Sequence, residues 1–345
     1  MIQSLCVAHT PPATTHHIFT SMSSAPSCCC RWFDGHLGGW FTDQESWQGS
    51  GQTIKTMQLY SDIDRIENEL REIGIAAGGA VTVEQLNKFD SLHYEGNDAV
   101  DAAAAFIGLS RAAAAGGLES NERVLDVGSG LGGPARYLAS QFRCRVTALE
   151  LQSDVHGKAK ELTMRAGLDD DVEHVNDDFL SVALAGLGPG PGGYDAVTSW
   201  LVFLHIPDKA TLLSKCAEML RPGGKMYVED FYRIGPPFSE AEARSLKVDV
   251  YCEKLSTREQ YVTTCEGAGF EEVEFEDKTA DWTAFVCERL VAFRAGRERF
   301  ERVHSDATYA KLLHFYEAVE RLFRGGHLGG VRLKATKKPY EDTTM

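Results

Sequence analysis

The sequence predicts an α/β fold in which a parallel β-sheet carries helices on both faces. Three observations predict it. Strand-like apolar segments alternate with amphipathic segments between Arg123 and Phe231. The amphipathic segments are about ten residues long, which suits the crossover helices that join parallel strands. A glycine-rich turn, Gly128–Gly133, follows the first strand, and ligands of such folds bind at the turns that follow the strands.

The alternating part contains five predicted strands with helices between them. Each strand is a short run of apolar and β-branched residues bounded by turn residues. The strands are RVLDV (123–127), RVTALE (Arg145–Glu150), VEHVN (172–176), YDAVTS (Tyr194–Ser199) and KMYVEDF (Lys225–Phe231). The helices cover Gly132–Gln141, a segment ending at Ala166, and Asp208–Leu220, and RPGG (221–224) is predicted to be a turn.

Further helices are predicted on both sides of this alternating part. Before it come an amphipathic helix carrying Ile63, Ile66, Leu70 and Ile73, a short helix with a Thr82/Gln85 capping box, and an alanine-rich helix that stops near Gly108. After it come helices over 239–254 and from Thr257 to Gly267, a strand over Glu271–Asp277, two long helices over Trp282–Val303 and Thr308–Phe323, and a last strand over Val331–Lys337.

The first 56 residues differ in composition from the rest and are expected to be a disordered or targeting leader. They are rich in Ser, Thr, Gly, Pro and Cys, and no acidic residue precedes Asp34. The missing acids resemble a transit peptide, although Arg31 is the only arginine of the segment. We therefore expect an intracellular protein, either cytoplasmic or, if the leader is a transit peptide, in a mitochondrion or chloroplast. A helical cap is expected over 57–108.

The net charge and the cysteine pattern limit the kinds of molecule that this chain is expected to bind. The formal net charge of −15 argues against nucleic acid and anionic membranes, which bind basic surfaces. No apolar run approaches the ~18 residues of a membrane span. None of the nine cysteines forms a C-x-x-C pair, so reduced thiols are expected and no metal site. The expected partner is a small-molecule substrate, and a homodimer is compatible with the sequence.

The glycine-rich turn lies in the stretch VLDVGSGLGGPARYLA. Gly128, Gly130 and Gly133 match the G-x-G-x-x-G pattern, which alone fits both a dinucleotide and a smaller adenosine cofactor. Asp126 separates these two interpretations, because a carboxylate beneath the turn would repel a pyrophosphate. It suits a ligand that carries an ammonium group and no phosphate, such as S-adenosylmethionine.

Glu150 at the end of the second strand can bond both hydroxyls of an adenosine ribose in either kind of cofactor, so it does not separate the two interpretations. Three later features agree with S-adenosylmethionine. Asp178 and Phe179 follow the third strand, where they can meet the amino group and the face of adenine. Ser199–Trp200 ends the fourth strand, and LRPGG leads into the fifth.

With these motifs, the chain resembles the class I S-adenosylmethionine-dependent methyltransferases. The resemblance implies a seven-stranded, Rossmann-like sheet whose last strand is antiparallel and lies between the fifth and sixth. It implies a methyltransferase domain over 109–340 with a helical insertion over 278–327. It also implies a cofactor site formed by Asp126, Gly128, Ser129, Gly130, Gly133, Glu150, Leu151, Asp178, Phe179, Ser199 and Trp200.

Within that family the chain is similar to small-molecule N-methyltransferases of the phosphoethanolamine type. The shared features are GSGLGG, Leu204–His205–Ile206, a tyrosine before the domain (Tyr94) and the K-A-T-K of the last strand (Lys334–Lys337). The resemblance implies that Tyr94 and His205 form a catalytic dyad and that Lys334 holds a phosphate. Residues expected to bind the substrate are Tyr94, His205, Tyr232, Tyr251 and Lys334.

One position departs from that subgroup and leaves the acceptor open. The subgroup has an acidic residue four positions before the histidine, and this chain has Leu201. A buried ammonium without a carboxylate is unfavourable. The preferred expectation is methylation of nitrogen on a small polar acceptor with an anionic end, of osmolyte or phospholipid-precursor type. The alternative is sulfur methylation of a thioether acid such as 4-methylthio-2-hydroxybutyrate, as in dimethylsulfoniopropionate synthesis. Carbon methylation, a dinucleotide oxidoreductase and an inactive scaffold also stay open.

Overall fold

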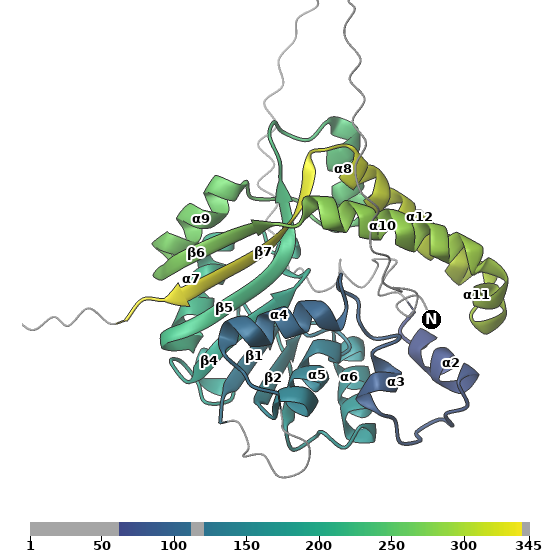
Figure 1. The fold of residues 1–345 in the computed structure, drawn as a ribbon, viewed down its shortest axis with the longest axis horizontal. Coiled ribbons are helices and arrows are strands. Elements are labelled where there is room, and N and C mark those ends of the chain that lie inside the picture. The colour runs from purple at the N-terminus through teal and green to yellow at the C-terminus, as the bar shows by residue number, and fades with distance from the viewer. Residues whose placement is uncertain (1–61, 112–120, 340–345) are drawn as a thin grey trace, which may run out of the picture.

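The computed structural model describes residues 62–111 and 121–339, which form a three-layer α/β structure around one sheet (Figure 1). The seven strands have the order β3-β2-β1-β4-β5-β7-β6, and only the pairs that include β7 are antiparallel. The predicted fold class is therefore confirmed. The expected leader, residues 1–56, lies outside the described residues. The strands are β1 (Arg123–Val127), β2 (Arg145–Glu150), β3 (Val172–Asn176), β4 (Tyr194–Trp200), β5 (Leu220–Arg233), β6 (Phe270–Asp277) and β7 (Leu328–Lys337).

Two layers of helices cover the sheet and explain why its central strands β1, β2 and β4 are largely apolar. One face packs on α4 (Asn97–Ile107), α5 (Gly133–Phe142) and α6 (Ser153–Arg165), which stand in front of the sheet in Figure 1. The other face packs on α7 (Lys209–Met219) and α9 (Arg258–Gly267). Strands buried on both faces lack the polar alternation of a half-exposed sheet.

The segments before the sheet follow the predicted pattern with shorter helices. The first described helix, α2 (Arg65–Glu72), buries Ile66 and Leu70. Thr82 forms the expected capping box with Gln85 at the start of α3 (Val83–Leu86). The C-cap of α4 is Gly108, whose positive φ of 91° suits a residue without a side chain.

The helical segment between β6 and β7 differs from the prediction of two long helices. It contains α10 (Thr279–Ala295), α11 (Arg297–Val303) and α12 (Asp306–Arg324). Gly296 separates the first two, since glycine is a poor helix former, and the periodicity on either side concealed the break. Figure 1 shows α10 and α12 side by side, with α11 at their far end near α2.

The predicted turn RPGG is also different in the structure. Residues 221–224 lie inside β5 as an irregular bulge, because Tyr194 pairs with Leu220 while Ala196 pairs with Lys225. The strand then continues to Arg233 along β7, beyond the predicted end at Phe231. The strand continues through the bulge because β5 pairs with β4 both before it, at Leu220, and after it, from Lys225.

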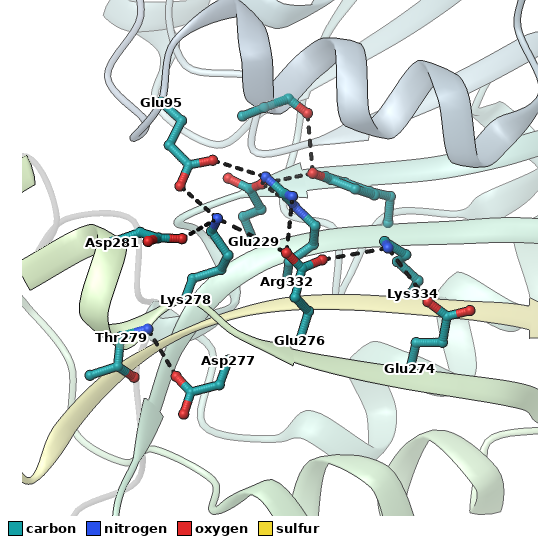
Figure 2. Close-up of polar contacts among 12 residues, drawn as sticks. Glu95, Glu229, Glu274, Glu276, Asp277, Lys278, Thr279, Asp281, Arg332 and Lys334 are labelled. Atoms are coloured by element: carbon teal, nitrogen blue, oxygen red, sulfur yellow. Dashed lines mark hydrogen bonds and ion pairs between the residues drawn. The ribbon is translucent and has the colours of Figure 1, made fainter. Parts of the chain in front are cut away.

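An ionic network ties the linker before α4 to the far side of the sheet (Figure 2). Glu95 pairs with Lys278 and with Arg332 of β7, each at 3.0 Å. The same Arg332 binds the buried carboxylate of Glu229 at 2.8 Å, which also accepts a hydrogen bond of 2.7 Å from the Tyr227 hydroxyl. Because Glu95 follows Tyr94 directly, the network fixes the linker where it crosses the ends of the strands.

We predict that Arg332→Gln lowers the free energy of unfolding by about 3 kcal/mol or more, because Glu229 would stay buried without its cation. Denaturant unfolding of the purified chain measures this loss. Lys334→Gln is the matched control on the same strand. Its partner Glu274 has a 64% exposed side chain, so its loss should stay below about 1 kcal/mol. Equal losses in the two variants would contradict the prediction.

Candidate active site

The glycine-rich turn sits at the carboxyl end of β1, where the strand order reverses between β1 and β4. Such a reversal opens a crevice beyond the strand ends. The amides of Gly128 and Ser129 both donate to the Leu149 carbonyl at 2.9 Å, which fixes the turn on β2. Gly128 has a φ of 75°, and a Cβ there would lie 2.4 Å from Val202. A side chain at this position is therefore excluded.

A buried ion pair supports the turn from behind. The Arg136 guanidinium binds Asp90 at 2.7 Å and the Leu131 carbonyl at 2.7 Å, and both charged side chains are at most 1% exposed. Burial raises the pKa of Asp90, and Arg136 opposes that rise. A Cβ on Gly133 would lie 3.0 Å from the Asp90 carboxylate. Gly133 thus leaves room for this ion pair, and it lines none of the cavities described below.

The first cavity lies between the ends of β1, β2 and β4 and has a volume of about 80 Å³. Glu150 in its wall is buried and accepts hydrogen bonds from the Gly130 amide (3.0 Å) and the Gln152 amide (2.8 Å). The Asp178 carboxylate accepts from the Leu180 amide at 2.9 Å. The cavity thus brings together six of the expected cofactor residues, which are Gly128, Gly130, Glu150, Leu151, Asp178 and Phe179.

The second cavity adjoins the same turn and has a volume of about 30 Å³. Four buried polar atoms in its wall have no hydrogen-bond partner in the described part of the chain: Asp90 Oδ1, Asp126 Oδ2, Ser129 Oγ and Trp200 Nε1. The other oxygen of Asp126 accepts a long hydrogen bond of 3.4 Å from Thr198. Burial raises the pKa of Asp126 to about 7, against the Thr198 hydrogen bond and with the help of the nearby Glu150 charge.

These unpartnered atoms test the fit of the expected cofactor. A ligand with an ammonium group would supply Asp126 with both a counter-charge and the missing hydrogen bond. A pyrophosphate would meet Asp126 and Glu150, two carboxylates close enough to raise the pKa of the first. The residues of this turn therefore fit the methionine end of S-adenosylmethionine, with its adenosine in the first cavity. Ser199 is an exception, because its hydroxyl donates to the Val127 carbonyl at 2.8 Å and lines neither cavity.

A third and larger cavity, of about 200 Å³, lies between α2, the linker before α4 and the helices α10–α12. It shares Leu92, His93 and Leu131 with the second cavity, so the two adjoin. Glu69 closes one side, where it binds Arg299 and His304 of the helical segment. This cavity is the space available to an acceptor beside the expected methionine end.

Tyr94 and His205, the expected dyad, do not meet among the contacts of the described residues. Tyr94 is buried in an aromatic cluster, with ring centroids 4.9 Å from Trp282 and 5.2 Å from Phe285. His205 lines the first cavity, and its Nδ1 donates to the Tyr251 carbonyl at 3.0 Å. Burial lowers the pKa of His205 to about 4, so the ring is neutral near pH 7.

Two further expected substrate residues point away from the cavities. Tyr232 lies on the opposite face of β5 from Phe231, and its hydroxyl donates to Asp277 at 3.0 Å. Lys334 pairs with Glu274 and Glu276 of β6 at 3.4 and 3.5 Å. Since β7 runs antiparallel to β5, Lys334 lies opposite Tyr227, four residues or about 13 Å before Phe231. The structure therefore places Lys334 in the middle of the sheet, apart from the cavities.

Sequence reasoning missed His93, which lines both the second and third cavities. Its Nε2 donates to the Gly96 carbonyl at 2.9 Å, and burial lowers its pKa to about 4. The signal was available, because His93 directly precedes the tyrosine chosen as catalytic. Attention to the tyrosine motif hid it.

A family model described as a methyltransferase domain matches residues 101–320. The chain belongs to this family. It is 33% identical over 156 residues to a sarcosine/dimethylglycine N-methyltransferase of Halorhodospira halochloris, a match covering 45% of this chain and 54% of that protein. It is 30% identical over 197 residues to phosphoethanolamine N-methyltransferase 3 of Arabidopsis thaliana, covering 57% of this chain and 38% of that one.

This chain also resembles the solved structure of Haemonchus contortus phosphoethanolamine N-methyltransferase 2 in complex with S-adenosyl-L-methionine. The TM-score is 0.68 and the sequence identity is 20%. The match covers 85% of this chain and 61% of that one. This likeness agrees with the fold. The chain spans about half, or less, of the length of the two curated relatives. Within residues 62–111 and 121–339, no helix has the length and apolar character needed to cross a membrane.

We predict that the affinity for S-adenosylmethionine rises with pH between about pH 5.5 and about pH 7. Asp126 has a pKa of about 7 in the free protein, so at lower pH it must lose a proton before it can bind an ammonium. The gain approaches tenfold per pH unit well below that pKa, and an α-amino group stays charged throughout this range. Calorimetric titration measures it. Asp126→Asn should weaken binding and flatten the profile, whereas a flat profile in the unsubstituted protein would refute the assignment.

We also predict that Glu150→Ala raises the dissociation constant for S-adenosylmethionine about tenfold or more, because charge-assisted hydrogen bonds to the ribose would be lost. Adenosine-free methionine analogues provide the control, since their binding should not depend on this residue. Unchanged affinity for the complete cofactor would mean that the ribose contact is misassigned.

Proposed function

We propose that this chain transfers a methyl group from S-adenosylmethionine to the nitrogen of a small polar acceptor with an anionic end. The observation that carries the proposal is the buried Asp126 carboxylate, with one oxygen unpartnered, beneath the glycine-rich turn. The two curated relatives, which act on sarcosine or dimethylglycine and on phosphoethanolamine, support the acceptor class.

The residues of the chain act mainly by binding and alignment. The cofactor supplies an already activated methyl group on its sulfonium. Asp126 and Glu150 hold its two ends, while the shared wall of Leu92, His93 and Leu131 brings the acceptor cavity beside the methionine end. Fixing the nucleophile in line with the methyl group and excluding water provide the rate enhancement in this arrangement.

His205 contributes orientation more than proton transfer. Its Nδ1 donates to the Tyr251 carbonyl, which leaves Nε2 as an acceptor on a residue that lines the first cavity. A pKa of about 4 makes the His205 ring a weak base. A protonated amine acceptor would therefore transfer its proton to solvent before the nitrogen attacks the methyl group. Tyr94 is enclosed by the rings of Trp282 and Phe285 of α10 and lines none of the three cavities.

The alternative, methylation of a thioether sulfur, has its own supporting observation. Leu201, where the related subgroup has an acid, packs against the aromatic cluster of Tyr94. The two carboxylates of the third cavity are engaged, Asp62 by Thr308 and Glu69 by Arg299 and His304. Glu69 is thus paired with cationic partners and Asp62 is held by a neutral hydroxyl, so an acceptor ammonium would have to compete with these contacts, whereas a neutral sulfur needs no carboxylate.

A screen with labelled S-adenosylmethionine tests both possibilities. The acceptors are glycine, sarcosine, dimethylglycine, phosphoethanolamine and 4-methylthio-2-hydroxybutyrate. Turnover of one or more amines supports the proposal. Turnover of the thioether acid alone would replace it with sulfur methylation, and absence of cofactor binding would overturn both.

We predict that the pH dependence of turnover identifies the reacting atom. At saturating cofactor, methylation of an amine should rise about tenfold per pH unit below the amine pKa, because only the neutral amine attacks. Methylation of a thioether should be independent of pH over the same range, since the sulfur carries no proton. Initial rates with each accepted substrate between about pH 6 and about pH 9 measure this difference. A pH-independent rate with an amine would contradict the nitrogen mechanism.

A further inference from the structure

Arg289 of α10 is a half-buried cation in the wall of the third cavity with incomplete hydrogen bonding. Its Nε and Nη2 atoms are shielded from solvent and have no hydrogen-bond partner in the part of the chain that the structure describes. These two nitrogens lie on the same edge of the guanidinium group. Their N–H bonds point in parallel, the arrangement that matches the two oxygens of a carboxylate.

Aromatic rings fix the orientation of this guanidinium. Its central carbon lies 4.5 Å from the ring centroid of Tyr316, 5.0 Å from that of Tyr94 and 5.4 Å from that of Phe285. Contacts with ring faces stabilise the cation, and a side-chain hydrogen bond joins it to Tyr94, which leaves Nε and Nη2 as its unpartnered donors. The Arg289 edge is therefore held in place while its donors stay available to a ligand.

No side chain of the described cavity wall neutralises Arg289. The wall has two carboxylates, Asp62 and Glu69, and both are bound elsewhere. It also contains Arg65, Lys88 and Arg299, so basic residues outnumber acidic ones here although the whole chain has a net charge of −15. An excess of positive charge inside an acidic protein favours an anionic ligand.

The position of Arg289 suits the far end of an acceptor. The cavity that contains it adjoins the methionine-end cavity through Leu92, His93 and Leu131. Its guanidinium also contacts Tyr94, the residue next to that shared wall. A small acid with its anion at Arg289 can therefore extend its other end toward the glycine-rich turn.

We infer that Arg289 binds the carboxylate of the methyl acceptor through two parallel hydrogen bonds and thereby selects small carboxylic acids. The inference rests on the proposed function and makes its acceptor class more specific. It replaces Lys334, which is engaged by Glu274 and Glu276, as the residue that holds the anionic end. It applies equally to an amino acid and to a thioether acid, because both carry the same group.

The test compares Arg289→Gln with the unsubstituted chain by calorimetric binding of dimethylglycine and 4-methylthio-2-hydroxybutyrate, with and without S-adenosylhomocysteine. We expect at least one of these acids to bind the unsubstituted chain. Its dissociation constant should rise about 10- to 100-fold in the variant, as expected for lost hydrogen bonds to a charged group. Affinity for S-adenosylhomocysteine itself should change less than about twofold, since the cofactor cavities do not include Arg289.

Two controls separate this role from a structural one. Arg294→Gln makes the same change on the same helix, at a 54% exposed side chain paired with Glu317, and should leave acid binding unchanged. The methyl ester of each acid should bind equally to the unsubstituted chain and to Arg289→Gln. Arg289→Lys keeps the charge but loses the paired donors, so its affinity should fall between the two.

Several outcomes would overturn the inference while leaving methyl transfer intact. These are equal binding of acids to Arg289→Gln and the unsubstituted chain, equal binding of acid and ester, failure of both acids to bind, and turnover of phosphoethanolamine alone. Failure of the proposed function has a different signature, namely no binding of S-adenosylmethionine or its demethylated product. Because acid binding is also measured without cofactor, that failure leaves the Arg289 result readable.

Discussion

Two carboxylates buried at the carboxyl ends of β1 and β2 determine what this site can bind. Asp126 and Glu150 lie close enough for one charge to raise the pKa of the other, and neither has a cation beside it among the described residues. Burying like charges is unfavourable unless a ligand compensates them. The glycine-rich turn, which excludes side chains, leaves space for a compensating group. The two carboxylates beneath the turn, rather than the glycine pattern, therefore indicate which kind of ligand the turn can accept.

On the side of the third cavity, the linker before α4 is attached to the rest of the structure at two points. Asp90 is held by Arg136 behind the turn, and Glu95 is held by Lys278 and Arg332 across the sheet. The residues between these anchors include His93, which faces the cavities. A short segment fixed at both ends can present side chains with little loss of entropy on binding. The cap and the sheet are thus joined through ionic contacts at the site itself.

Much of the fold could be predicted because its signals are local. The hydrophobic period, the capping residues and the glycines mark most helices and strands. These local signals do not predict features that depend on pairing between strands, such as the bulge of β5. Strand order also allowed the sequence to indicate residues that the structure brings around one cavity, since Gly130, Glu150 and Asp178 all follow or end strands. The acceptor side was not indicated in this way. Lys334 lay in a recognisable motif, but strand register turns it toward β6, while Arg289 lies in an ordinary helical segment that only tertiary packing brings beside Tyr94.

Ion pairs between α2 and α11 make the contact of these two helices sensitive to dissolved salt. Arg299 binds Glu69, Arg302 binds Glu72, and these pairs bridge the outer edge of the third cavity. Partly exposed ion pairs contribute little individually and weaken as dissolved ions screen them, over a Debye length of about 8 Å at physiological salt. The free energy needed to part the two helices therefore falls as ionic strength rises. The strength of this contact is thus coupled by simple electrostatics to the salinity of the surrounding solution.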